Sequence, residues 1–164
     1  MFLWEGKLTM SNISIILRKV KTFIKIDSKT KFDFLYAYFY TGIFRMYIFF
    51  VPFNKLRKKM GTSKVESEKI IDDSSYREAQ HISWIIANVI RFTPWESKCL
   101  VQSLTAQKML RRKGISSTLY LGVKKDENGK MIAHSWIRSG EYCVTGGSEM
   151  KGFAVVAKFA DCTC

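Results

Sequence analysis

The sequence predicts an α+β fold, in which a helical N-terminal half packs on a core made of one helix followed by an antiparallel sheet. Apolar residues recur at helical spacing in 13–26 and 75–91, whereas after Gly114 short β-leaning runs alternate with turn signals. With 164 residues, 47% of them apolar, the chain is long enough to bury one core. We therefore predict an N-terminal extension (1–12), a helical region (13–92) and a core region (93–164) that forms one compact unit with the helical region.

The first residues leave two translation starts open, Met1 and Met10. The stretch 13–26 then fits a basic amphipathic helix, with Arg18, Lys19, Lys21 and Lys25 among its apolar residues. We interpret this stretch as a solvated basic face. Peripheral contact with a membrane is the less favoured alternative.

Residues 34–53 form the most apolar window and are numerous enough to span a bilayer. Arg45 near the centre of the window disfavours insertion, and Gly42 favours a break in the helix. We therefore predict a buried helix pair rather than a membrane span. After a polar connector, Ser74 or Ser75 is expected to cap a helix that runs to Arg91.

A further helix of about four turns is predicted after Cys99, where apolar residues again recur at helical spacing. A thiol at a helix N-terminus lies at the positive end of the macrodipole, which favours the reactive thiolate. Lys98 would act in the same direction. Cys99 is thus a candidate nucleophile.

Two starting points for this helix remain open. Thr93-Pro94-Trp95-Glu96 fits a capping box, which would place Cys99 in the second turn with its amide already bonded. Alternatively Ser97 caps a helix that starts at Lys98, and the amide of Cys99 is then free to stabilise an oxyanion. Catalysis at Cys99 requires an arrangement of the second kind.

Short β-leaning runs at 117–124, 131–138 and 141–146 predict an antiparallel meander, and 153–159 predicts a fourth strand. Asn128-Gly129 and Ser139-Gly140 are the turn signals between these runs. With two-residue loops at both turns, His134 would face Val123 on one side and Thr145 on the other.

Cysteine usage and charge limit the classes of function. The four cysteines lack the spacing of a disulfide framework, and with no signal peptide they indicate a reducing compartment, the cytoplasm. Neither a metal site nor a cofactor is predicted, because Cys162-Thr163-Cys164 has no second pair. The net charge of +13 is compatible with nucleic acid, but no recognition motif accompanies it, so nucleic acid is not a predicted partner.

Five short blocks of the second half occur in a fixed order. They are Cys99-Leu100-Val101-Gln102-Ser103-Leu104, Leu110-Arg111-Arg112-Lys113-Gly114-Ile115, Leu121-Gly122-Val123, Ala133-His134-Ser135-Trp136 and Val144-Thr145-Gly146-Gly147. Together they resemble the lasso peptide biosynthesis leader peptidase, a transglutaminase-like cysteine protease that removes the leader from a lasso precursor. The resemblance covers about 18–160 and is most specific over 95–159. It implies that 93–164 is a papain/transglutaminase-like catalytic core.

The resemblance also implies a Cys-His-acid site, with Cys99 as nucleophile and His134 as general base and then general acid. Where relatives are expected to carry an aspartate, eleven or twelve residues after the histidine, this chain has Thr145 and Gly146. Either Glu149 or Thr145 orients His134, or the site works as a dyad. Trp95 and Trp136 are predicted to wall the substrate groove, although Trp136 fits a core aromatic equally well.

The partners implied by the resemblance are a precursor peptide, a separate leader-binding (precursor recognition) protein and a lasso cyclase. The helical N-terminal half lacks the short strands that a fused leader-binding domain would need, so this partner is expected in trans. Two other classes of function remain open. One is an acyl-transferring enzyme of the transglutaminase or amidase type, and the other is a non-catalytic protein that binds the precursor.

Overall fold

The computed structural model describes residues 27–162 and confirms the predicted α+β class. Two compact units are distinguished, 1–33 and 34–164. The N-terminal extension and the basic helix that we predicted at 13–26 lie outside the described residues. The following paragraphs concern the second unit, which contains every residue predicted for the site.

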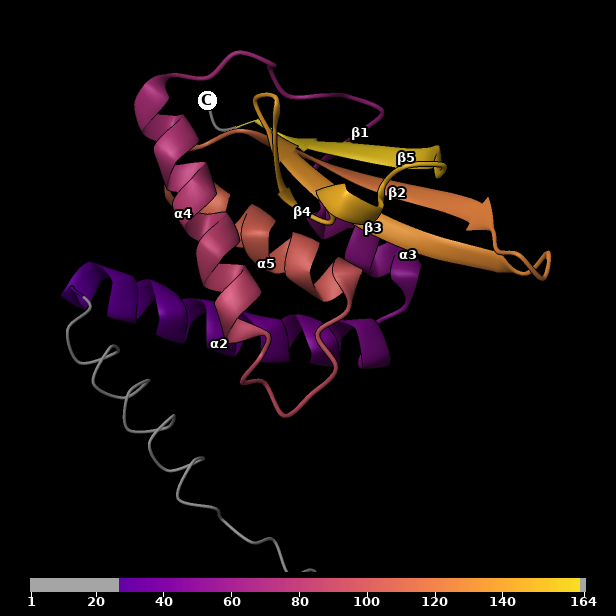
Figure 1. Cartoon of the computed structure of the whole chain (residues 1–164), viewed down its shortest axis with the longest axis horizontal. Coiled ribbons are helices and arrows are strands. Elements are labelled where there is room, and N and C mark those ends of the chain that lie inside the picture. Colours follow the sequence, from indigo (N-terminus) through magenta and orange to yellow (C-terminus); the bar gives the residue numbers. More distant parts are fainter. Residues whose placement is uncertain (1–26, 163–164) are drawn as a thin grey trace, which may run out of the picture. The chain divides into compact units, whose positions relative to one another are not determined.

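The described chain contains four α-helices and a five-stranded sheet (Figure 1). The helices are α2 (Ser28–Phe50), α3 (Phe53–Leu56), α4 (Asp73–Val89) and α5 (Cys99–Arg112), with 3-10 turns η1 (Arg57–Lys59) and η2 (Gly147–Glu149). The strands are β1 (Thr62–Ser63), β2 (Ser117–Lys125), β3 (Met131–Ser139), β4 (Tyr142–Thr145) and β5 (Ala154–Asp161).

The sheet has the order β1-β5-β2-β3-β4, and every neighbouring pair is antiparallel. Helix α5 contacts β2, β3 and β4, and α4 contacts both α5 and β4. Apolar side chains from these elements form one core: Ile82 and Ile86 of α4, Leu104 and Leu110 of α5, and Leu119 and Ile137 of the sheet. Burial of this core fixes the start of α5 beside the middle of β3.

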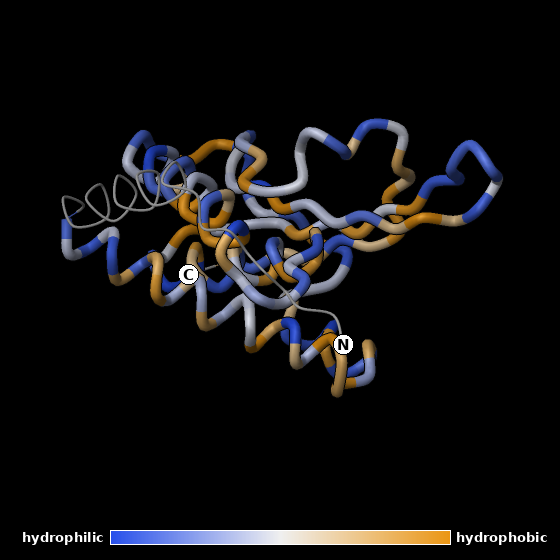
Figure 2. Tube along the Cα trace, turned by 60° about the horizontal axis from the view of Figure 1, so that its bottom comes forward, coloured by the Kyte–Doolittle hydropathy of each residue, from blue (hydrophilic) through white to orange (hydrophobic). Residues whose placement is uncertain are grey.

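Helix α2 is one uninterrupted helix through Gly42, so the predicted helix pair is wrong. A Cβ at position 42 would lie 3.0 Å from the Trp95 ring, so the glycine serves close packing rather than a break. Ala37 is fully buried, whereas Leu35, Phe39, Met46 and Phe50 are more than half exposed. Figure 2 shows hydrophobic positions along the length of this helix. Within 27–162, no helix combines the length and the apolar character needed to cross a membrane.

The N-cap of helix α4 lies two or three residues before the predicted caps, Ser74 and Ser75, and the helix ends at Val89 rather than at Arg91. Asp72 is its N-cap, and the Asp72 carboxylate accepts hydrogen bonds from the amides of Ser74 and Ser75. His81 lies on this helix, with its ring stacked at 6.2 Å on Trp84.

The loop between β2 and β3 is one residue longer than predicted. Gly129 N donates to Asp126 O (3.0 Å), and the Asp126 carboxylate accepts from the amides of Asn128 and Lys130. Gly129 has a φ of 74°, a left-handed conformation that completes a three-residue turn. The register therefore shifts by one residue, which places Gly122 opposite His134 instead of Val123.

The second hairpin is shifted as well. Ser139 pairs with Tyr142, so the loop lies one residue further along the chain than the predicted Ser139-Gly140 turn, and the register shifts again within β3. Thr145 consequently pairs with Ile137. The predicted pairing of Thr145 with His134 is therefore wrong.

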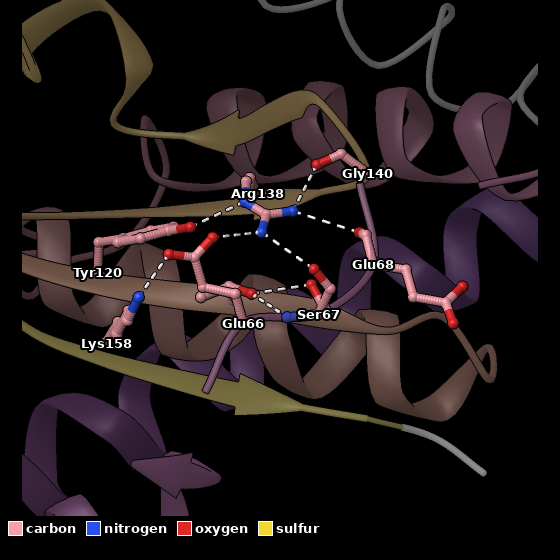
Figure 3. A network of polar contacts seen from close by, with 8 residues as sticks. Glu66, Ser67, Glu68, Tyr120, Arg138, Gly140 and Lys158 are labelled. Atoms are coloured by element: carbon pink, nitrogen blue, oxygen red, sulfur yellow. Dashed lines mark hydrogen bonds and ion pairs between the residues drawn. The ribbon is translucent and has the colours of Figure 1, made fainter. Parts of the chain in front are cut away.

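Arg138 ties the segment before α4 to the sheet (Figure 3). Its guanidinium donates to the Tyr120 hydroxyl (2.8 Å), to the Glu66 carboxylate (2.9 Å) and to the main-chain oxygens of Ser67, Glu68 and Gly140. Lys158 adds a 2.8 Å hydrogen bond to the other oxygen of Glu66. A planar donor with five N–H groups suits this cluster of oxygens, which a lysine could not satisfy.

Candidate active site

A cavity of about 360 Å³ lies between the start of α5, the middle of β3 and the segment after β4. Eight residues line it: Lys98, Cys99, Gln102, Ala133, His134, Gly146, Ser148 and Glu149. Strand β4 ends at Thr145, opposite Ile137, so it does not extend along β3 as far as His134. The cavity therefore brings Cys99 and His134 to one open stretch of the sheet edge.

Cys99 is the first residue of α5, so the start at Pro94 is wrong and the helix begins one residue after the alternative start at Lys98, with Lys98 rather than Ser97 as its N-cap. The residue before the helix is Lys98, and the first helical bond runs from Gln102 N to Lys98 O (3.1 Å). The turn at 93–97 is separate and is held by a 3.0 Å contact between the hydroxyls of Thr93 and Ser97. As the first helical residue, Cys99 has no acceptor for its amide inside the helix, so this amide can serve an oxyanion.

The charge of Lys98 is largely engaged by a neighbour. Its ammonium lies 2.8 Å from a carboxylate oxygen of Glu96, whose other oxygen lies 3.2 Å from Arg45. The hydrogen bond from Lys98 lowers the pKa of Glu96 below its ordinary value. Cys99 therefore lies beside a lysine that is paired with Glu96 and at the positive N-terminal end of the α5 macrodipole.

His134 is 7% exposed. Its ring packs against two aromatic side chains, one of which, Trp136, lies on the same face of β3. The centroid of the ring lies 5.3 Å from that of Phe153 and 6.0 Å from that of Trp136. Gly122, directly opposite on β2, makes room for both aromatics, because a Cβ there would lie within 3.0 Å of each. This packing leaves the imidazole few orientations.

The two nitrogens of His134 have different surroundings. Nε2 lies 2.9 Å from the main-chain oxygen of Gly146, and Nδ1 lies 3.9 Å from a carboxylate oxygen of Glu149. The side chain of Glu149 is 77% exposed. Thr145, the other residue predicted to orient His134, instead places its hydroxyl 3.1 Å from that of Ser103.

The two tryptophans predicted for the substrate groove do not line the cavity. Trp95 lies against α2, where its indole N–H donates to the Thr41 hydroxyl (3.3 Å) and its ring meets Tyr38 at 5.0 Å. Trp136 is 8% exposed and stacked between His134 and Tyr120. The Trp136 ring therefore packs against the imidazole of His134 and limits its movement.

Five of the residues that line the cavity were not among the predicted site residues: Lys98, Gln102, Ala133, Gly146 and Ser148. Two of them contribute polar contacts that bear on the site. Gln102 follows Cys99 by three positions, and this helical spacing could have indicated a shared face. Its side-chain amide donates to Ser97 O (2.8 Å), which ties the preceding turn to the helix. Gly146 contributes a main-chain oxygen, which no side-chain pattern reveals.

Cys143 is a second thiol close to the site, and it differs from Cys99 in its surroundings. Its sulfur lies 3.3 Å from Thr145 O, and burial raises the pKa of the Cys143 thiol above its ordinary value. Among the described residues, no group of three or more His, Cys, Asp and Glu side chains has the arrangement of a metal site.

Comparison with known protein families identifies one that covers the cavity. The model of the Transglutaminase-like superfamily matches residues 48–158, well over half of the sequence. The chain belongs to the Transglutaminase-like superfamily. The match extends from the end of α2 into β5 and includes all the cavity residues. Neither the curated proteins nor the solved structures gave a significant match.

A transglutaminase-like core, with its helix followed by an antiparallel sheet, is therefore confirmed. Enzymes of this superfamily are commonly cysteine peptidases or acyl transferases. Both reactions begin with attack of a thiolate on a carbonyl carbon, and both need a base near the thiol and donors for the oxyanion. The cavity offers a thiol, an imidazole and a free helix N-terminal amide for these roles.

Proposed function

We propose that this protein is a cysteine endopeptidase that removes the leader peptide from a lasso peptide precursor. The observation that carries the proposal is the cavity shared by Cys99, at the N-terminus of α5, and His134. The superfamily match supports the thiol chemistry, and the five sequence blocks support the choice of substrate.

In this proposal His134 accepts the proton of the Cys99 thiol, and the thiolate attacks the carbonyl carbon at the leader-core junction. The main-chain amide of Cys99 donates to the oxyanion of the tetrahedral intermediate. When the C–N bond breaks, His134 returns its proton to the leaving amine, which becomes the N-terminus of the core peptide. Water, activated by the same imidazole, then hydrolyses the thioester and releases the leader with a free carboxylate.

The proposed partners are the precursor peptide, a leader-binding protein that acts in trans and a lasso cyclase that receives the freed amine, all in the cytoplasm. The exposed apolar side chains of α2, including Phe39 and Met46, support the partner in trans, because apolar patches of this kind mark interaction surfaces. The net charge of +13 favours an acidic partner.

An acyl transferase is the second candidate, because the superfamily includes enzymes that pass the same thioester to an amine instead of water. A non-catalytic role is the third, and the missing aspartate is the observation that favours it. The three candidates differ in what happens to a bound precursor.

The decisive experiment is mass spectrometry of a cognate precursor incubated with this protein and its leader-binding partner, with and without an added primary amine. We expect wild type and the His81→Ala control to release the leader as a free acid, while Cys99→Ala and His134→Ala do not. A leader that carries the added amine would establish acyl transfer. Leader removal by Cys99→Ala would refute the thiol mechanism, and no cleavage by any variant would favour the non-catalytic role.

A further inference from the structure

Gly146 follows His134 by twelve residues and occupies the place where the expected aspartate is missing. Resting on the thiol mechanism above, we propose that the main-chain carbonyl of Gly146 replaces that acid and holds His134 in the tautomer protonated at Nε2. Gly146 is thus a positioning residue that acts through its backbone. The site then works as a triad whose third member is a main-chain carbonyl, which residue types in a sequence do not reveal.

The tautomer follows from the chemistry of the two atoms. A carbonyl oxygen has no hydrogen to donate, so a 2.9 Å contact with it is a hydrogen bond only if Nε2 carries the proton. The His134 side chain is 6% exposed, so water has little access to replace this partner. With the proton on Nε2, neutral His134 presents the lone pair of Nδ1, which in the proposed mechanism is the nitrogen that accepts the proton of Cys99 across their shared cavity.

The backbone around Gly146 holds the carbonyl in place. Gly146 has a φ of 75°, in the left-handed region, as the chain leaves β4 and enters η2. A Cβ at this position would lie 2.5 Å from Ser135 O and 3.0 Å from His134 Nε2. Only glycine therefore brings the main chain this close to the imidazole. On the preceding residue, the Thr145 hydroxyl contacts Ser103 of α5 and anchors the segment to the helix that begins with Cys99.

Glu149 faces the other nitrogen and takes a different role. A neutral imidazole carries only one N–H, so it cannot donate to Gly146 and to Glu149 together. After His134 accepts the thiol proton, both nitrogens are donors, and the carboxylate 3.9 Å from Nδ1 then favours the imidazolium. The carbonyl sets the tautomer of the resting enzyme, whereas the carboxylate contributes only after proton transfer.

Nitrogen-15 NMR of the Cys99→Ala protein tests the tautomer without any substrate. The chain has two histidines, so a His81→Gln variant assigns the spectrum. At a pH where the imidazole is neutral, we expect the proton of His134 on Nε2, with a coupling through the hydrogen bond to the carbonyl carbon of Gly146. A proton on Nδ1, or no coupling to Gly146, would overturn the proposal. Because no cleavage is measured, this result is independent of the proposed function.

A backbone ester tests the contribution to catalysis. Cys143 allows ligation of a synthetic 143–164 segment in which glycolic acid replaces Gly147, so that the Gly146 carbonyl belongs to an ester and is a weaker acceptor. We expect kcat for leader cleavage to fall about tenfold with KM nearly unchanged, the order of one weakened hydrogen bond.

The matched control is an ester at Lys151–Gly152, in the exposed turn before β5, and the reference is the semisynthetic wild type. Equal rates for the two esters would refute a positioning role for the Gly146 carbonyl, as would a loss that appears only in KM. A semisynthetic wild type that folds but does not cleave would contradict the proposed function instead, and the NMR result would still decide the tautomer.

Discussion

The hydroxyls of Ser103 and Thr145 are 3.1 Å apart, and both residues are buried. Ser103 lies one helical turn after Cys99, and Thr145 immediately precedes Gly146. The pair therefore joins the helix that presents the thiol to the segment that contacts His134. Its position indicates that Thr145 holds the two sides of the cavity together rather than orienting the histidine directly.

Replacing Thr145 by valine removes this hydrogen bond while keeping the shape of the side chain. We expect Thr145→Val to lose about 1 kcal/mol of unfolding free energy in urea, because the Ser103 hydroxyl is left without this partner. Thr145→Ser should keep most of the stability. Leader cleavage by the valine variant should remain within about tenfold of wild type, since a geometric shift of this kind does not remove a catalytic group. A folded Thr145→Val protein without any cleavage would make Thr145 part of the catalytic machinery.

Removal of the Glu149 charge should have a small effect. Because its side chain is 77% exposed and 3.9 Å from Nδ1, the pair has the energy of a surface contact, about 0.5 kcal/mol. Glu149→Gln is therefore expected to change the single-turnover cleavage rate by no more than about threefold, mostly on the acid side of the pH profile. Glu141→Gln, in the exposed loop after β3, is the control for loss of a carboxylate. A loss above about a hundredfold at every pH would identify Glu149 as the third member of the site.

Much of the transglutaminase-like core could be predicted because local signals there agree with the fold. The thiol at a helix start, the change to β-leaning runs after Gly114 and the Asn128-Gly129 turn each follow from nearby residues. The errors arose where one residue decides the outcome. In a strand a shift of one residue changes the residue on the opposite strand. The extra residue in the β2–β3 loop therefore places Gly122, and not Val123, opposite His134.

Other features depend on contacts between distant parts of the chain. Gly42 looked like a helix break because its partner, Trp95, is more than fifty residues away. The role of Gly146 depends on a main-chain oxygen, whose direction is fixed by tertiary structure and not by residue type. Sequence reasoning therefore named Cys99 and His134, which the structure brings to one cavity, but not the main-chain oxygen that contacts His134.

The two described thiols near the cavity should differ in reactivity. The pKa of Cys143 is raised by burial, so little thiolate forms there near neutral pH, whereas Cys99 lies at a helix N-terminus. At about pH 7 we expect iodoacetamide to modify Cys99 at least about tenfold faster than Cys143, and the Cys143 rate to rise with pH. Peptide mapping by mass spectrometry separates the sites, and Cys99→Ala shows whether Cys143 reacts in its place. Equal rates at pH 7 would contradict the assignment of Cys99 as the activated thiol.

The Glu66 contacts predict how stability depends on pH. Hydrogen bonds from Lys158 and then from Arg138 lower the pKa of Glu66 from 4.5 to about 2 in the folded protein. The folded state thus favours the carboxylate, so this contribution to stability is present above about pH 4.5 and is lost as the pH falls towards 2. Urea unfolding should show Glu66→Gln less stable than wild type at pH 7, with the difference shrinking by pH 3.

Glu68→Gln is the matched control for this prediction. Arg138 contacts only the main-chain oxygen of Glu68, and Figure 3 shows the Glu68 carboxylate pointing away from the guanidinium. Removal of the Glu68 charge should therefore leave the unfolding free energy nearly unchanged at both pH 7 and pH 3. Because Glu66 is a third exposed, solvent screens its ion pairs and the effect should stay small. A Glu66→Gln deficit that is the same at pH 7 and pH 3 would mean that the contacts act through shape rather than through charge.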